Sequence, residues 1–122
     1  MSSPPALQNL EIYRGTDHSA GYIFSNEAAD GTVTPLNLNG ATILAQVWDK
    51  ERKYKYADFE VTYTDRPAGE FFLKLPDTVT LHLPDIAYYD VVLLNTGADR
   101  EPYVRGVITT LMGYSRWQKK SM

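Results

Sequence analysis

Residues 36–49 read Leu-Asn-Leu-Asn-Gly-Ala-Thr-Ile-Leu-Ala-Gln-Val-Trp-Asp. The pair Asn39-Gly40 predicts a tight turn, because glycine supplies the freedom in φ that such a turn needs. Beyond the turn, apolar side chains alternate as they do in an extended strand. One face of this strand holds Ile43, Ala45 and Val47, and the other holds Leu44, Gln46 and Trp48. The stretch therefore predicts a turn followed by a β-strand over residues 41–49.

The same alternation recurs in later segments of the chain. It puts apolar side chains on one face of each segment: Phe59, Val61 and Tyr63, then Phe71, Leu73 and Leu75, then Tyr89, Val91 and Leu93. We expect strands near Leu10–Ile12 and over residues 19–26, 41–49, 58–64, 70–75, 87–95 and 103–112. Residues 77–83 predict a short strand or an irregular crossover in which a single helical turn is possible.

Turn signals punctuate the chain about every 8–12 residues, a spacing typical of a β-sandwich. No window keeps the 3.6-residue apolar period of an ordinary helix. The sequence thus predicts an all-β fold, a single antiparallel β-sandwich of about seven or eight strands. Val92 and Leu94 give one strand a second apolar face, which indicates that a neighbouring element or a partner covers it as well.

Three segments are predicted from the local composition. Residues 1–9 form an arm that is loose or ordered by a partner, and residues 10–112 form the β-sandwich domain. Residues 113–122 form a basic, aromatic tail that contains Tyr114, Arg116, Trp117, Lys119 and Lys120. Tyr, Trp and Arg often dominate protein interfaces, so the tail predicts a docking segment, with a solvated terminus as the alternative.

Charge and composition exclude several partners. The 122 residues carry a net charge of only -3, so no global field attracts nucleic acid. No run of about eighteen apolar residues is present, so no membrane span is predicted. The N-terminus lacks the basic start and apolar core of a secretory signal. Cysteine is absent, which excludes a disulfide framework and a thiol nucleophile.

Catalytic chemistry has little support in the sequence. His18 and His82 stand alone, without the close acidic or histidine neighbours of a metal site. No serine lies in a Gly-x-Ser-x-Gly motif, and no glycine-rich loop precedes a helix. The carboxylates that could pair for glycoside chemistry fall on predicted outward strand positions: Asp58, Glu60, Glu70 and Asp90. We therefore predict a non-enzymatic protein without a metal or cofactor.

Exposed aromatic side chains raise carbohydrate binding as an alternative. Candidate sugar platforms are Trp48, Tyr54, Tyr56, Tyr88 and Trp117. The competing interpretation is that these rings cover the edges of the sandwich or pack beneath the charged hairpin tip at residues 50–53.

A resemblance to a known family rests on several motifs in order. They are Tyr13-Arg14-Gly15-Thr16-Asp17, Pro35-Leu36-Asn37-Leu38-Asn39-Gly40-Ala41-Thr42-Ile43, Pro67-Ala68-Gly69, Tyr89-Asp90-Val91 and Arg105-Gly106-Val107-Ile108. Together they cover most of residues 10–110 and resemble the small immunoglobulin-like domain of tailed bacteriophages, found at the N-terminus of baseplate upper proteins and related fibre-attachment proteins. The chain departs from that pattern at Thr16 and Asn39, and in residues 83–87, which lack the usual glycine.

The resemblance implies an immunoglobulin-like β-sandwich and a structural role in the virion. The protein would be made in the bacterial cytoplasm and assembled into a tail, a baseplate or a fibre attachment, in contact with other virion proteins and with copies of itself. A capsid decoration protein is the alternative within assembly. The residues expected at protein interfaces are Trp48, Tyr114, Arg116, Trp117, Lys119 and Lys120.

Overall fold

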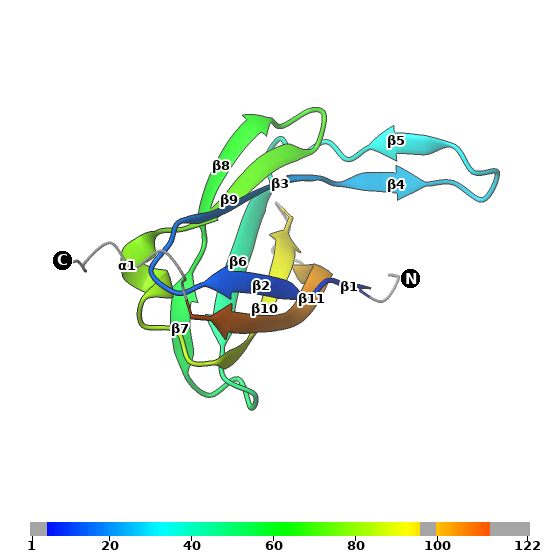
Figure 1. The fold of residues 1–122 in the computed structure, drawn as a ribbon. Coiled ribbons are helices and arrows are strands. Elements are labelled where there is room, and N and C mark those ends of the chain that lie inside the picture. Colours follow the sequence, from blue (N-terminus) through cyan, green and yellow to red (C-terminus); the bar gives the residue numbers. More distant parts are fainter. Residues whose placement is uncertain (1–4, 96–99, 113–122) are drawn as a thin grey trace.

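The fold is all-β, as the alternating pattern predicts. A computed structural model describes residues 5–95 and 100–112 (Figure 1). Strands make up 60% of these described residues, and helix is almost absent from them. The single helix in this described part is α1 (Asp77–Thr80), the helical turn that the sequence allowed.

The larger sheet has six strands and is built around the stretch quoted first. Its order is β1-β11-β10-β6-β7, and β2 also pairs with β11. The strands are β1 (Ala6–Leu7), β2 (Leu10–Tyr13), β6 (Thr42–Trp48), β7 (Lys55–Asp58), β10 (Ile86–Leu94) and β11 (Arg100–Leu111).

Two smaller sheets complete the fold. One has the order β3-β9-β8, with β3 (His18–Ile23), β8 (Glu60–Asp65) and β9 (Glu70–Leu75). The other pairs β4 (Ser25–Glu27) with β5 (Val33–Pro35). The expected strand over residues 19–26 is thus divided at Phe24, whose buried side chain separates β3 from β4.

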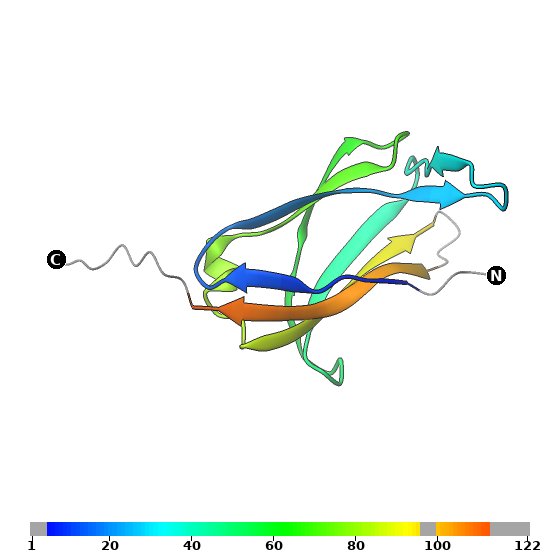
Figure 2. The ribbon, with the colours of Figure 1, turned by 45° about the vertical axis from the view of Figure 1, so that its right-hand side comes forward.

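The three-stranded sheet lies over one face of the six-stranded sheet (Figure 2), and the core fills the space between them. Three of the four predicted apolar faces are confirmed, since no more than a few per cent of each residue is exposed at Ile43, Ala45, Val47, Phe71, Leu73, Leu75, Tyr89, Val91 and Leu93. On the fourth face Phe59 is buried, whereas Val61 and Tyr63 are partly buried against the core. Aromatic rings join the layers, with Phe59 and Tyr89 centroids 5.9 Å apart and Phe24 and Tyr103 centroids 4.6 Å apart. Burial of this apolar surface is the main force that holds the sheets together.

Two strand pairs correct the expectation of a wholly antiparallel fold. Both β1 and β2 run parallel to β11, with Ala6 opposite Val104 and Leu10 opposite Ile108. We call these pairings the N-terminal seam. Part of the expected loose arm, residues 6–7, is therefore a strand of the sheet. The eleven strands of the described residues also exceed the expected seven or eight, because the N-terminal segment is divided and β4–β5 is added.

A missing side chain permits the N-terminal seam. A Cβ on Gly106 would overlap the carbonyl oxygen of Gln8 and lie 2.6 Å from its carbonyl carbon. Because glycine has no Cβ, the backbone at Gln8, which lies between β1 and β2, can pass close to Gly106 of β11. At this point the Gln8 N–H donates to the carbonyl oxygen of Arg105 at 2.9 Å. Tyr89 Oη then donates to the Gln8 carbonyl at 2.7 Å, so a core tyrosine holds the N-terminal strand in place.

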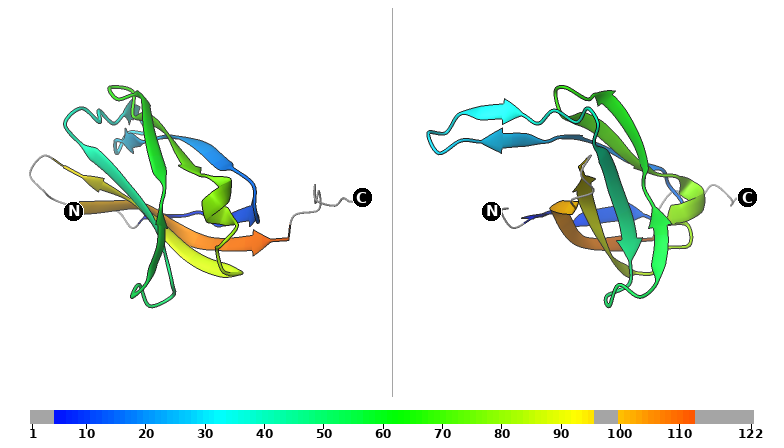
Figure 3. Two further views of the ribbon diagram at one scale, coloured as in Figure 1. Left: turned by 90° about the vertical axis from the view of Figure 1, so that its left-hand side faces the viewer. Right: turned by 180° about the vertical axis from the view of Figure 1, so that it is seen from behind.

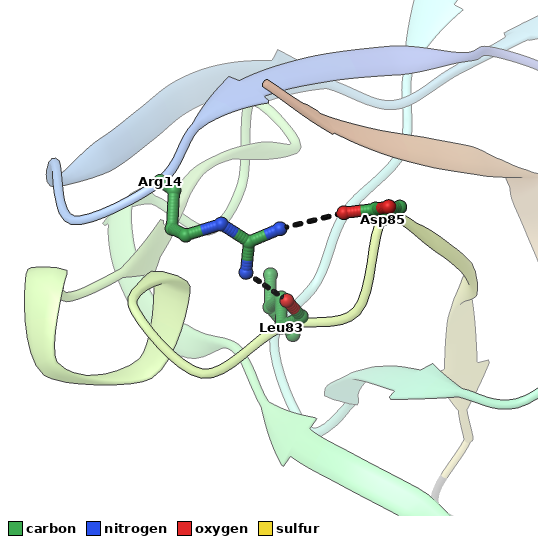
Figure 4. Close-up of polar contacts among 3 residues, drawn as sticks. All are labelled: Arg14, Leu83 and Asp85. Carbon is green, nitrogen blue, oxygen red and sulfur yellow. Dashed lines mark hydrogen bonds and ion pairs between the residues drawn. The ribbon is translucent and has the colours of Figure 1, made fainter. Parts of the chain in front are cut away.

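Arg14 ties the turn after β2 to the segment that leads into β10. Its guanidinium donates to the carbonyl oxygen of Leu83 and, at 2.9 Å, to Oδ1 of Asp85 (Figure 4). Nearby, the buried Thr80 hydroxyl of α1 donates to the Thr16 carbonyl at 2.7 Å and accepts from Gly15 N–H at 3.1 Å. These contacts fix one end of the molecule.

The hairpin β4–β5 extends away from the body at the opposite end (Figure 1, Figure 3). We call residues 25–35 the hairpin arm. Every residue of the arm is exposed. Its base is closed by the Leu36 N–H, which donates to the Phe24 carbonyl at 2.9 Å, and its tip by the predicted Asp-Gly turn.

Candidate functional site

The outer face of the six-stranded sheet carries a group of apolar, aromatic and charged side chains. The register of β6 and β10 puts Tyr88 opposite Trp48, Asp90 opposite Gln46, and Val92 opposite Leu44. On β11, Pro102 lies opposite Val92 and Arg100 opposite Leu94. Because strand side chains alternate, these residues point away from the core. The second apolar face expected from Val92 and Leu94 is therefore present.

A shallow hollow of about 330 Å³ is sunk into this face. We call it the sheet hollow; its lining residues are Leu44, Gln46, Trp48, Arg52, Asp90, Val92, Arg100 and Pro102. Of the apolar residues in the lining, Leu44, Trp48 and Val92 are partly buried and Pro102 is exposed. The three-stranded sheet lies on the opposite side of the six-stranded sheet (Figure 2). Because the lining residues are on the outer face, the hollow opens away from the core.

An ion pair orders one wall of the sheet hollow. Arg52 Nη1 contacts Oδ2 of Asp90, and only 13% of the Asp90 side chain remains exposed. Asp90 thus lies on the predicted outer face but is covered by arginine. Arg52 comes from the tip of the β6–β7 hairpin and has a φ of 59°, which is uncommon outside glycine. The tip therefore contributes a side chain to the sheet hollow.

Asp49 fixes the backbone that carries Arg52. Its Oδ1 accepts hydrogen bonds from the backbone N–H groups of Lys53, at 2.8 Å, and Tyr54, at 3.1 Å. Local bonds of this kind are a common way for aspartate to stabilise a turn. The sequence at residues 50–53 indicated only a charged, solvated turn.

The expected aromatic residues are dispersed in the structure. Trp48 lies in the sheet hollow, and Tyr88 is its cross-strand neighbour. Tyr54 and Tyr56 instead contact each other edge to face, with ring centroids 5.0 Å apart. Of the residues expected at protein interfaces, Trp48 alone is described. Tyr114, Arg116, Trp117, Lys119 and Lys120 lie outside the described residues.

Sequence reasoning missed most of the sheet hollow. Gln46 shares a face with Trp48, and the alternation around Asp90 and Val92 could have suggested that both strands present one surface. Nothing in the sequence paired Arg52 with Asp90, which is 38 positions away. The roles of Arg100 and Pro102 depend on a register that is shifted by a bulge between Val91 and Val92.

Groups that could support catalysis or metal binding remain separate. Residues 5–95 and 100–112 contain no group of three or more His, Asp or Glu side chains arranged to hold a metal ion. Partial burial lowers the pKa of His18, while His82 is exposed. Asp58 accepts from Lys55 Nζ at 3.1 Å. In this described part, no helix has the length and apolarity to cross a membrane.

A scan against protein-family models and a search of curated protein sequences both found no match to this chain. The candidate site therefore rests on its own geometry. A shallow, partly apolar hollow with an ordered ion pair and an aromatic ring suits recognition of another surface or of a small polar ligand.

Proposed function

We propose that this chain is a non-enzymatic structural protein of a tailed-bacteriophage virion. It acts as a small tail, baseplate or fibre-attachment component through protein–protein assembly. It is made in the bacterial cytoplasm and incorporated into the particle, where its partners are other virion proteins and copies of itself, and neither nucleic acid nor a membrane.

The observation that carries the assembly role is the outer face of the six-stranded sheet. Its side chains at Leu44, Trp48, Tyr88 and Val92 form an apolar group outside the core. Apolar surface of this kind, bordered by charged side chains, is characteristic of protein interaction sites. Arginine and tryptophan, both present in the sheet hollow, are among the residues that most often dominate binding energy.

The strand order supports an immunoglobulin-like sandwich within this proposal. In a variable-type immunoglobulin domain, strands G, F, C and C′ share one sheet, while B, E and D share the other. The orders β11-β10-β6-β7 and β3-β9-β8 correspond to these two groups in chain order. With the N-terminal strands as A, eight strands are accounted for, and the hairpin arm is an insertion between B and C.

Labelling of purified particles tests the virion role. Antibodies to this chain, coupled to gold, are applied to particles of the phage that encodes it. Labels at the tail or baseplate are expected; labels over the head would favour the capsid decoration alternative. Particles that lack the chain by mass spectrometry would overturn the proposal.

Two matched variants then test the surface. Trp48→Ala is expected to reduce incorporation into particles, because it removes an aromatic ring from the sheet hollow. Tyr54→Ala removes an aromatic that is more exposed and does not line the hollow, so incorporation should be retained. Equal incorporation of the two variants would contradict a role for this surface.

Carbohydrate binding is the second candidate, favoured by the composition of the sheet hollow. Trp48 offers a ring for stacking, and Gln46, Asp90 and Arg52 offer hydrogen-bond partners for hydroxyl groups. A glycan array with Trp48→Ala as the control separates the candidates. Binding of a defined glycan that is lost in this variant would favour the carbohydrate-binding module.

A further inference from the structure

The two strands of the hairpin arm pair with each other and with no other described strand, so the rest of the fold contributes little to their stability. Three residue pairs join β4 and β5, and all of residues 25–35 are exposed. An isolated two-stranded hairpin is at best marginally stable in water. An arm that extends from the body without a core of its own is therefore expected to gain stability from a partner surface.

One face of the hairpin arm combines apolar and acidic side chains. Glu27 lies opposite Val33, and Ser25 lies opposite Pro35, so these four residues share a face. Val33 is 62% exposed. The arm contains two acids, Glu27 and Asp30, and no basic residue. The surface that would cover it should thus be partly apolar and positively charged.

The sheet hollow has these properties. Its lining includes Leu44, Val92 and Pro102 as apolar residues, and two arginines against one aspartate give it a net charge of +1. Arg52 is already paired with Asp90, whereas Arg100 is exposed at the rim and makes no ion pair with any described side chain. Arg100 is therefore the charge that an incoming acidic group would meet.

We infer that the hairpin arm of one copy docks in the sheet hollow of a second copy, with Glu27 facing Arg100 and Val33 facing the apolar floor. The inference rests on the proposed assembly role and adds a defined self-contact to it. Each copy carries both surfaces, so the contact is made between different patches. It can close reciprocally in a dimer or continue from copy to copy into a ring.

Charge reversal on each surface tests the contact by light scattering. The wild-type chain should form an oligomer whose mass falls as salt rises, because the contact is partly electrostatic. Glu27→Lys and Arg100→Glu should each give monomers. Mixed in equal amounts, the two variants should assemble again into a dimer or a ring with an even number of copies, because every junction between unlike variants joins opposite charges. If the wild-type assembly has an even number of copies, the mixture should recover its mass.

Matched controls separate this contact from general charge effects. Glu11→Lys and Lys74→Glu make the same charge changes at exposed positions away from both surfaces and should keep the wild-type mass. Circular dichroism should show the same β-sheet signal in all five chains. Replacement of residues 25–35 by a short glycine-rich link should also give a folded monomer, since Phe24 and Leu36 are already hydrogen-bonded at the base of the arm.

Two outcomes would overturn the inference. One is a wild-type chain that is monomeric at its highest soluble concentration, and the other is an oligomer that survives both charge reversals. A monomer that still appears in labelled virions would overturn the self-contact while leaving the proposed virion role intact. A Trp48-dependent glycan bound by that monomer would assign the sheet hollow to a sugar instead.

Discussion

At the scale of single residues, Gly106 decides whether the N-terminal strand can lie on β11. Gly106→Ala would force the new methyl group against the Gln8 carbonyl and within 3.1 Å of the Tyr89 ring. Overpacking of this kind typically costs about 1–3 kcal/mol. We expect a loss of that size in the free energy of unfolding measured with urea.

Gly31 provides the comparison for Gly106. Nothing lies within 4 Å of a Cβ placed there, although its φ of +91° is in the left-handed region. Asparagine tolerates that region better than other residues, so Gly31→Asn should cost less than about 1 kcal/mol. Equal losses in the two variants would show that close approach is not the reason for glycine at position 106.

Because of Tyr89, the stability of the fold should depend on pH in the alkaline range. Burial, and then the proximity of Tyr22, raise the pKa of the Tyr89 hydroxyl above its ordinary value of 10.0. Above pH 10 the unfolded chain therefore loses this proton while the folded chain keeps it. The contribution of the Tyr89 hydroxyl to stability should be constant below that pH and fall above it, by at most about 1.4 kcal/mol per pH unit.

Tyr89→Phe tests this origin of the pH dependence. The variant should be less stable at pH 7 by about 1–2 kcal/mol, because the Gln8 carbonyl loses its donor. Its decline above pH 10 should be shallower than that of the wild type. Tyr22, whose pKa is also raised by burial, should retain a smaller part of the decline. Parallel curves for the two proteins would contradict the assignment.

At the scale of elements, Arg14 connects the β2–β3 turn to the start of β10. The Asp85 side chain is 90% exposed, so its ion pair with Arg14 should contribute less than about 1 kcal/mol. The Leu83 carbonyl accepts from the same guanidinium at a part-buried site, where loss of a charged donor costs about 1–3 kcal/mol. Arg14→Ala should therefore destabilise the fold clearly more than Asp85→Asn in chemical unfolding. Similar losses would mean that the exposed ion pair, and not the carbonyl, holds the turn.

The strands of the core could be predicted because each carries its own signal. Phe71, Leu73 and Leu75 alternate without interruption, so their burial follows from the period of an extended chain. The parallel seam could not be predicted in this way. It depends on Gln8, Tyr89 and Gly106, three residues that are far apart in the sequence and whose contact no local pattern indicates.

The sheet hollow, too, could be predicted only in part from the sequence. Trp48 was identifiable as an outward aromatic, but the sheet hollow also needs Arg52 to fold back onto Asp90 and a bulge to set the position of Pro102. These are consequences of strand pairing and turn geometry. The family resemblance and the virion role stay predictions, as do the interface roles of residues 114–120.

At the scale of the whole molecule, the parallel seam determines how the domain would carry a load. Residue 5 directly precedes β1 and residue 112 directly follows β11, so the two lie at opposite ends of neighbouring parallel strands. Tension applied between these two residues pulls the strands past each other. The hydrogen bonds of the seam then resist together instead of opening one after another.

Single-molecule pulling would reveal this mechanical anisotropy. Handles at Pro5 and Met112 should require a clearly higher rupture force than handles at Ile86 and Met112, which peel β10 from β11 beginning at the Ile86–Thr109 pair. Equal forces in the two geometries would count against the seam as a mechanical clamp. Such a domain resists tension applied between residues 5 and 112 and yields more easily to tension that separates β10 from β11.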